Sequence, residues 1–292
     1  MDSQNKKPFS LKNIYRFTFH SLNSQPKLLI PFLIFAAVEA VFLFFIYVAP
    51  RLPFRTVLGP PIRAFWGEGF LHYPANFILL PKLASMSRTF LSVILGSLTT
   101  GMAVSMAFEI YNKKAIRLPD ILKSTFRRYG PLFIVLLLIT AFFYGLAKLA
   151  FVSLTKYFMA GHTALLYLKP RIWLGPVLFG INLLIVIFVQ AVFIYAIPLL
   201  IIAKEKLFKA IIKSFVLFIK LFIPTIILIT LPVLFYIPIL VLQYNTSYLI
   251  NNVFPESVLI LAFVSIIISS LVVDFLITVS TTFLYLKNKE NV

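Results

Sequence analysis

The sequence predicts an all-α polytopic membrane protein with six transmembrane helices. Of its 292 residues, 61% are hydrophobic and only 12% are charged, whereas soluble domains have roughly 25% charged residues. Six apolar runs are each long enough to cross the ~30 Å hydrocarbon core of a bilayer. A soluble fold of this size could not bury so much apolar surface, so these runs are expected to face lipid.

The six predicted spans cover residues 28–50, 89–111, 131–152, 173–203, 221–242 and 257–286. Apolar runs of this length favour helices over barrel strands, which would be about ten residues long and alternating in character. The first run is too long for the core of a signal peptide, and no small-residue cleavage site follows it. We therefore expect one integral membrane domain over residues 1–292.

The placement of basic residues predicts the orientation. The net charge is +18, and most of the 27 Lys and Arg lie in the N-terminal segment, the second and fourth connections and the C-terminal tail. Six spans put these segments on one side, and the positive-inside rule makes that side the cytoplasm. The expected location is a prokaryotic plasma membrane with both termini inside. Because topology accounts for the charge, no nucleic-acid partner is expected.

A basic amphipathic pattern occurs three times. In each copy apolar or Thr side chains recur at i, i+3, i+4, i+7, i+8 and i+11, which is one face of a helix, and a base stands at i+5. The faces are Leu11, Ile14, Tyr15, Thr18, Phe19 and Leu22; Leu118, Ile121, Leu122, Thr125, Phe126 and Tyr129; and Phe208, Ile211, Ile212, Phe215, Val216 and Ile219, with the bases Arg16, Lys123 and Lys213.

Each copy precedes two spans, so we predict three repeat units over residues 9–112, 113–203 and 204–286. In each unit the apolar helix face would enter the acyl boundary, and the basic face would meet anionic headgroups at the cytoplasmic surface. The alternative is that these helices only join spans and fix orientation, without docking another membrane or soluble subunit. The candidate lipid-surface residues are Arg16, Lys123, Arg127, Arg128, Lys209 and Lys213.

Ionisable and polar side chains inside the spans are candidates for function, because they are costly in lipid. Glu39 lies near the middle of span 1, Glu109 at the cytoplasmic end of span 2 and Asp274 in the inner half of span 6. Ser270 and Thr278 continue the polar stripe of Asp274, at helical spacing. We predict a polar path across the bundle. Its candidate residues are Glu39, Glu109, Gln190 and Asp274, with Arg88 and Lys148, near the outer ends of spans 2 and 3, as charge partners.

A structural role for these groups is the alternative. They would then hydrogen-bond one helix to another, or Glu39 and Asp274 would be protonated. Two further patterns bear on the arrangement. Small residues recur every four positions before Glu109 and would let another helix approach closely. The first outer connection, rich in Pro, Gly and aromatic residues, is expected to rest in the outer interface or to act as a lid.

The sequence lacks the motifs of common enzymes, and we expect a protein without catalytic activity. The chain has no Cys and only three His, which are scattered. It has no HExxH, GxxxxGK[ST] or GxSxG pattern. We therefore expect no cofactor, no metal and no catalytic residues. The segments outside the spans are too short for an ATPase domain, so energy from ATP would have to come through a partner subunit.

The stretch IPLLIIAKEKLFKAIIKSFVLFIK resembles a phrase of bacterial multi-span proteins. In that phrase a Pro ends an apolar run, and an acidic residue and Ala-Leu-x-x-Ser follow before the next span. The corresponding residues here are Pro198, Glu205, Ala210, Ile211 and Ser214. The group includes the membrane domain attached to glycerophosphodiester phosphodiesterases and other six-span families. The resemblance covers about half the chain and implies the fold. It does not imply the activity, because the phosphodiesterase domain is missing.

Two functions fit these observations. The first is a non-enzymatic membrane protein that organises or supports membrane components through its basic helices. The second is the permease subunit of a transporter for a lipid-like or small polar substrate, with the polar residues of the spans along its path.

Overall fold

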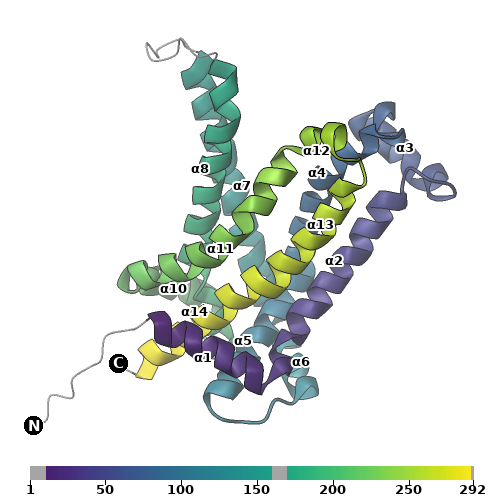
Figure 1. Ribbon diagram of the computed structural model, residues 1–292. Helices are drawn as coiled ribbons and strands as arrows, with labels where there is room; N and C mark the ends of the chain where they lie inside the picture. Colours follow the sequence, from purple (N-terminus) through teal and green to yellow (C-terminus); the bar gives the residue numbers. More distant parts are fainter. Residues whose placement is uncertain (1–10, 160–169, 291–292) are drawn as a thin grey trace, which may run out of the picture.

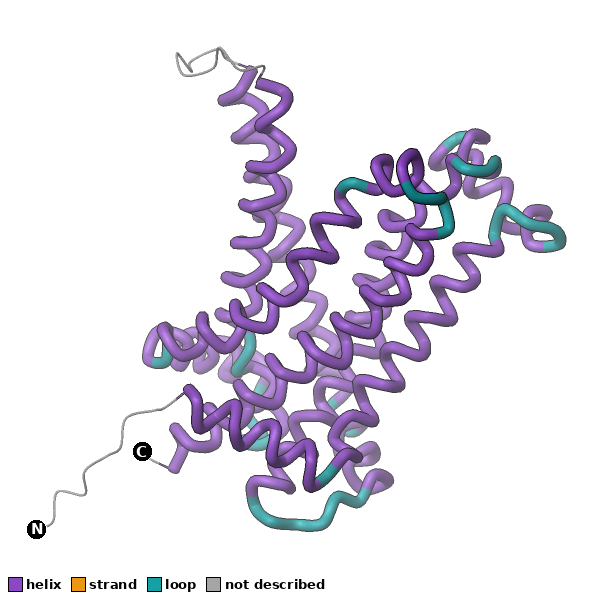
Figure 2. The backbone as a smooth tube through the Cα atoms, viewed as in Figure 1, coloured by secondary structure: helices purple, strands orange, loops and turns teal. Residues whose placement is uncertain are grey.

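The computed structural model describes residues 11–159 and 170–290, and no strand occurs in these two ranges (Figures 1 and 2). Within them, six helices are long and apolar enough to cross a membrane: Pro26–Val48, Ala75–Tyr111, Tyr129–Lys156, Gly175–Ile201, Phe222–Tyr244 and Ser257–Glu290. The predicted all-α polytopic membrane fold is therefore confirmed. Long apolar runs become helices here because a helix satisfies all its backbone polar groups internally, as lipid requires.

Several spans are built from consecutive helical segments. Spans 2 and 6 each contain one π-helical turn, η3 and η4, in which the backbone hydrogen bond runs from i to i+5. The segments are η1 (Pro26–Leu29) and α2 (Ile30–Val48); α4 (Ala75–Leu91), η3 (Ser92–Gly96) and α5 (Ser97–Tyr111); α7 (Tyr129–Met159); α8 (Pro170–Phe193) and α9 (Ala196–Ile201); α11 (Phe222–Tyr244); and α13 (Ser257–Ile268), η4 (Ser269–Asp274) and α14 (Phe275–Glu290).

The predicted start of span 2 at residue 89 is wrong, because the helix begins at Ala75. Pro81, Lys82 and Arg88 lower the hydropathy of this stretch and hide its helical character. The helix nevertheless continues, because Lys82 is exposed and the charge of Arg88 is paired inside the bundle. Arg88 therefore lies within span 2 and not at its outer end.

Short helices cover the two ends of the bundle. We call one end the basic end: it carries α1 (Leu11–Ser24), α6 (Leu118–Phe126), α10 (Leu207–Lys220) and the last turns of α14 (Figure 1). The far end carries α3 (Phe54–Trp66), η2 (Glu68–Leu71) and α12 (Thr246–Asn252). The three basic segments are thus helices at one end. Their origin as three repeat units stays a prediction, and Phe9 and Ser10 of the first unit lie outside the described residues.

The three amphipathic helices bury different shares of their predicted apolar faces in the protein, and their contact with lipid stays a prediction. On α1, Ile14 and Thr18 are buried against the protein, because this helix packs on α14. On α6, Ile121 and Thr125 are likewise buried. On α10 the predicted apolar face is mostly open, and the protein contact is made by Ala210, Ser214 and Phe218. The open side chains of α10 are Phe208, Ile212, Phe215, Val216 and Ile219.

The largest hydrophobic core lies toward the basic end, around α14, where nearly every side chain is buried. α5 closes tightly on α6 and α7 at Gly101, where an added Cβ would lie 2.7 Å from Thr125 Cγ2 and 2.8 Å from Leu132 Cδ1. Ser105, one turn further on, is 3.5 Å from the Thr125 hydroxyl. The small-residue face of span 2 thus permits the close helix approach that the sequence predicts.

The hairpin of α7 and α8 leans away from the other spans toward its tip (Figure 1). Tyr244 at the end of α11 still reaches the outer half of α8, where its ring lies 5.9 Å from that of Phe179. Most side chains of α7 are not buried inside the protein. At the far end, α3 exposes Val57 and Phe65, as expected of a segment that rests in the membrane interface; the side chain of Trp66 lies outside the described residues. Exposed apolar side chains at these places face lipid in a bilayer.

Candidate functional site

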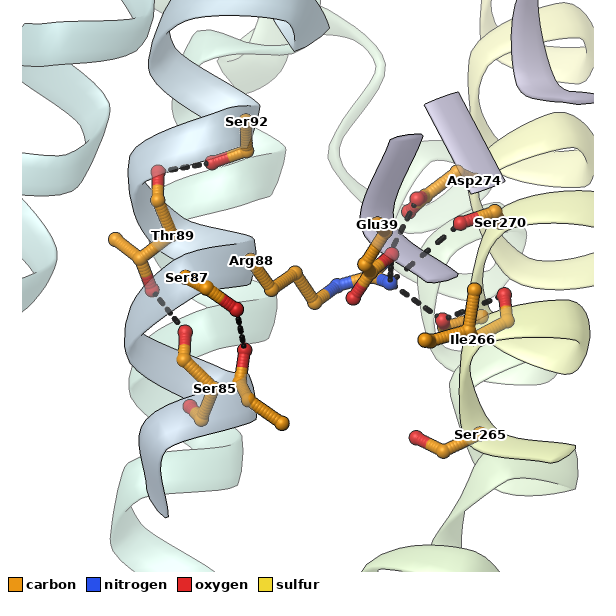
Figure 3. A network of polar contacts seen from close by, with 12 residues as sticks. Glu39, Ser85, Ser87, Arg88, Thr89, Ser92, Ser265, Ile266, Ser270 and Asp274 are labelled. Carbon is orange, nitrogen blue, oxygen red and sulfur yellow. Dashed lines mark hydrogen bonds and ion pairs between the residues drawn. The ribbon is translucent and has the colours of Figure 1, made fainter. Parts of the chain in front are cut away.

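The candidate site is centred on Arg88, which joins three spans. Its Nη1 donates a hydrogen bond to Glu39 Oε2 over 2.7 Å, and its Nη2 donates to Asp274 Oδ2 over 2.8 Å (Figure 3). Glu39 comes from α2 and is only 5% exposed, and Asp274 comes from η4. Charge-assisted hydrogen bonds of this length are among the strong ones. They offset the large cost of placing a carboxylate in an apolar interior.

Other groups complete the surroundings of the guanidinium. Ser269 Oγ accepts a hydrogen bond from Nη1 over 2.6 Å, and Ser270 Oγ lies 3.5 Å from the same nitrogen. The ring of Phe35 lies beneath the guanidinium carbon, 5.7 Å from it to the ring centroid. The planar fork of Arg therefore has polar partners from two helices and one aromatic face. A Lys at this position could not reproduce that arrangement.

The two π turns border this site. In η4 the i to i+5 repeat puts Ser269 and Asp274 on one face, whereas an α-helix would turn them roughly 140° apart. In span 2, η3 begins four residues after Arg88, and the Ser92 N–H is shared between the carbonyls of Arg88 and Thr89. Single π turns often occur at functional sites. Here one of them re-aims a carboxylate and a hydroxyl at the same arginine.

Arg88 and Asp274 also line a cavity of about 330 Å³. Its walls come from spans 1, 2, 3, 4 and 6, with apolar side chains such as Phe32, Leu136 and Val189. This volume is in the usual range of small-ligand pockets, which are mostly apolar with a few polar groups. The polar side chains on its wall, besides the ion pair, are Thr89, Ser92, Thr99, Thr100, Thr140, Gln190 and Thr278.

The structure brings together part of the predicted polar path. Glu39, Arg88 and Asp274 meet, and Gln190 lies on the wall of the same cavity. Glu109 does not join them, because it lies near the end of α5 at the basic end. Lys148 does not pair with Glu39 or Asp274 in the described part of the chain. It is exposed on α7, and both carboxylates pair with Arg88.

Ser269, Thr140 and Phe35 also surround the site, and none of them was predicted from the sequence. Ser269 adjoins Ser270, and only the π turn brings both toward the arginine. Thr140 is a lone hydroxyl in an apolar run, and Phe35 is one of 32 Phe residues. Arg88, in contrast, was predicted as a charge partner. A charged residue between apolar stretches, with one carboxylate in span 1 and another in span 6, suggests an internal ion pair.

A second polar cluster lies at the basic end. Glu205 precedes α10 and accepts hydrogen bonds from Lys213 and, over 3.2 Å, from Lys209. Hydrogen bonding from Lys213, with that from Lys209, holds the pKa of Glu205 below its usual value. Lys209 and Lys213, predicted as lipid-surface residues, therefore also fix the start of α10. Arg16, Lys123 and Arg127 are exposed at this end, and Arg128 is half-buried.

Tyr15 fastens α1 to the spans. Its hydroxyl donates a hydrogen bond to the carbonyl of Leu228 in α11 over 3.3 Å. Burial raises the pKa of Tyr15 to about 12, so the hydroxyl keeps its proton and its donor role at neutral pH. The first amphipathic helix is thus held by a specific contact as well as by its apolar face.

No protein-family model, no curated protein and no solved structure matches this chain. The resemblance at residues 197–220 therefore stays a prediction. The features that bear on function are the ion-paired cavity and the basic end. Within the described part of the chain, no group of three His, Asp or Glu side chains is placed to hold a metal ion.

Proposed function

We propose that this protein is a non-enzymatic permease subunit that binds a lipid-like or small polar substrate inside the membrane. One observation carries the proposal: the cavity of about 330 Å³ between five of the spans, with Arg88 and Asp274 on its wall. Polar groups on a mostly apolar wall suit a substrate that must leave water or the headgroup region. An ion pair there, supported by two Ser hydroxyls, supplies groups that can exchange partners with a substrate.

The division of the spans supports the same proposal. Leu136, Ile139, Thr140 and Phe143 of α7 form one wall of the cavity, and Arg88 and Asp274 lie on other spans. The α7–α8 hairpin contacts the remaining spans through the core at the basic end and along α11, which α8 follows as far as the contact of Phe179 with Tyr244. Movement of such a hairpin against a better-packed bundle would open a path to one side at a time, as in alternating access.

The lack of Cys makes a direct test possible, because a single introduced Cys is the only thiol. Thr140→Cys places a thiol on the cavity wall, and Leu138→Cys places one on an exposed position of the same helix that is not part of the wall. We expect a charged, membrane-impermeant thiol reagent to label the Thr140→Cys variant from both sides of oriented vesicles and to leave the Leu138→Cys variant unlabelled. A cavity-wall thiol that no aqueous reagent reaches from either side contradicts the permease proposal.

A second function, the organisation of membrane components, is favoured by a different observation. α10 leaves Phe208, Ile212 and Phe215 exposed beside Lys209 and Lys213. Such a helix suits the inner interface of a membrane, with the rings among acyl chains and the ammonium groups at anionic headgroups. On this proposal the basic end faces the cytoplasm of a prokaryotic plasma membrane and gathers anionic lipids or other subunits.

Charge reversal tests this second function. Lys123→Glu with Lys213→Glu should weaken the retention of anionic phospholipid in native-lipid particles, measured by lipid mass spectrometry. Lys82→Glu, on an exposed position of α4 away from the basic end, is the control. Equal lipid retention in the doubly reversed protein and the control contradicts the organising role. Labelling of Lys114→Cys and of Glu68→Cys from opposite sides would test the orientation.

A further inference from the structure

We infer that the cavity binds an amphipathic organic cation, with Asp274 as the group that meets its positive charge. This inference rests on the proposed permease function and names the substrate class of the same site. It starts from the charge of the ion-paired group. Glu39 and Asp274 are two carboxylates around one guanidinium, so the ionised group has one net negative charge.

The excess negative charge faces the cavity through Asp274. The Glu39 side chain is 5% exposed and takes no part in the cavity wall, whereas the Asp274 side chain is 37% exposed and does. Only Oδ2 of Asp274 accepts a hydrogen bond from Arg88. Glu39 and Arg88 therefore form an inner neutral pair, and the other oxygen of Asp274 remains able to meet a ligand.

The remaining wall fits a cation and not an anion. Arg88 and Asp274 are the charged residues on the wall in the described part of the chain, and the positive charge of Arg88 is already matched by Glu39. An anion would have to compete with two carboxylates for one guanidinium. A cation would meet a carboxylate at short range against a mostly apolar wall, where the attraction is larger than in bulk water.

Aromatic rings strengthen this conclusion. Phe32, Phe143 and Phe193, from three different spans, form part of the same wall. The face of an aromatic ring attracts an ammonium group, and the attraction grows when the group is desolvated. The rings and the aliphatic wall would hold an apolar body next to the charged group. The cavity volume of about 330 Å³ suits a small amphipathic cation.

The test compares three ligands of similar size in a protein whose charged groups are all intact. These are benzyltrimethylammonium, which is permanently charged, its neutral isostere neopentylbenzene, and benzenesulfonate. Binding is measured as protection of the introduced thiol in the Thr140→Cys variant, with protein in particles of zwitterionic lipid. We expect the affinity for the cation to be at least about tenfold higher than that for the neutral compound. The anion should give no protection of the thiol.

Substitutions then assign the charge to Asp274. Asp274→Asn should weaken cation binding about tenfold or more and leave binding of the neutral isostere unchanged, since Arg88 keeps Glu39. Asp120→Asn, on the exposed face of α6, removes one carboxylate elsewhere and should change neither affinity. Because the ligand comparison needs no change at Asp274, a poorly folded Asp274 variant does not prevent a decision.

The possible outcomes separate the two proposals. Equal protection by the cation and the neutral isostere would overturn the cation inference and leave the permease proposal standing. Cation binding with the cavity-wall thiol reachable from one side only would support the cation site and count against transport. Stronger protection by benzenesulfonate than by the cation would show that Arg88, and not Asp274, governs the site, and would also overturn the inference.

Discussion

Arg88 and Asp274 are 186 residues apart in the chain, yet their side chains are joined by a hydrogen bond of 2.8 Å between Nη2 and Oδ2. Their helices are the second and the last spans, and Glu39 of the first span completes the contact. Glu39 and Arg88 pair only when spans 1 and 2 meet, and Asp274 gains its partner only when span 6 packs against them. Since lone charges in a lipid interior are costly, the ion pairs favour one arrangement of the three helices.

The first prediction concerns Arg88→Met, which leaves Glu39 without its partner in a position where it is 5% exposed. We expect the free energy of unfolding to fall by about 3 kcal/mol or more, because an unpaired buried charge remains. The measurement is unfolding in mixed micelles with increasing denaturing detergent. Lys82→Met on the same helix is the control and should change the free energy by about 0.5 kcal/mol or less.

The same experiment has a second arm. Glu39→Gln combined with Arg88→Gln removes the inner neutral pair as a unit, so the double variant should lose less stability than the sum of the single variants. Additive effects of the two substitutions would contradict the coupling of Glu39 and Arg88.

The second prediction concerns the π turn in span 6. Ser269 Oγ accepts from Arg88 over 2.6 Å and donates to the Ile266 carbonyl over 3.2 Å. Ser269→Ala should cost about 1–3 kcal/mol, because a charged donor loses a buried acceptor. Ser265→Ala, one turn earlier, removes a buried hydroxyl that contacts Tyr236 and not Arg88. An equal fall in the free energy of unfolding in both variants would contradict a special contribution of the contact between Ser269 and Arg88.

The third prediction concerns Gly101. Gly101→Ala places a Cβ 2.7 Å from Thr125 Cγ2 and 2.8 Å from Leu132 Cδ1, so these side chains or the helices that carry them must shift. Overpacking of this kind typically costs about 1–3 kcal/mol, measured as a lower midpoint of thermal unfolding. Gly145→Ala is the control, since no atom lies within 4 Å of its added Cβ and Ala favours the helix. A stabilised Gly101→Ala variant would contradict the close approach of α5 to these helices.

The fourth prediction concerns pH. The pKa of Glu205 is lowered by hydrogen bonds from Lys213 and Lys209. A carboxyl with a lowered folded-state pKa stabilises the fold above its unfolded-state pKa of about 4.3, and this contribution fades as the pH falls through the folded-state value. Glu205→Gln should therefore lower the midpoint of thermal unfolding at pH 7, and the difference from the unmodified protein should shrink as the pH falls below about 4.

A matched control for that pH series is Glu68→Gln. Glu68 pairs with Arg63 over 3.3 Å, but both side chains are at least half exposed, and exposed ion pairs contribute little. The midpoint of thermal unfolding of this variant should equal that of the unmodified protein, both at pH 7 and below about pH 4. A Glu205→Gln difference that persists unchanged in acid would show that the carboxylate is not the source of the stabilisation.

Much of the fold could be predicted from the sequence, because membrane helices are recognisable by length and apolar composition. The six spans were predicted in order, and the basic segments lie at one end of the bundle. The start of span 2 could not be found, since Lys82 and Arg88 depress its hydropathy and their surroundings are set by other helices. Of the residues predicted for the polar path, Gln190 and Asp274 line the cavity. Glu39 does not line it but pairs with Arg88, which does. Glu109 lies near the end of α5, at the basic end.

The sequence alone determined that this is an all-α polytopic membrane protein, because the spans form one by one in response to lipid and need no knowledge of their neighbours. Only the tertiary structure decided which polar groups meet. The contacts of Arg88 with Glu39 and Asp274 depend on three separate spans, and the alignment of Ser269 with Asp274 depends on a π turn. Hydropathy reports the energy of each residue in lipid, whereas helix packing and local winding decide which side chains share a site.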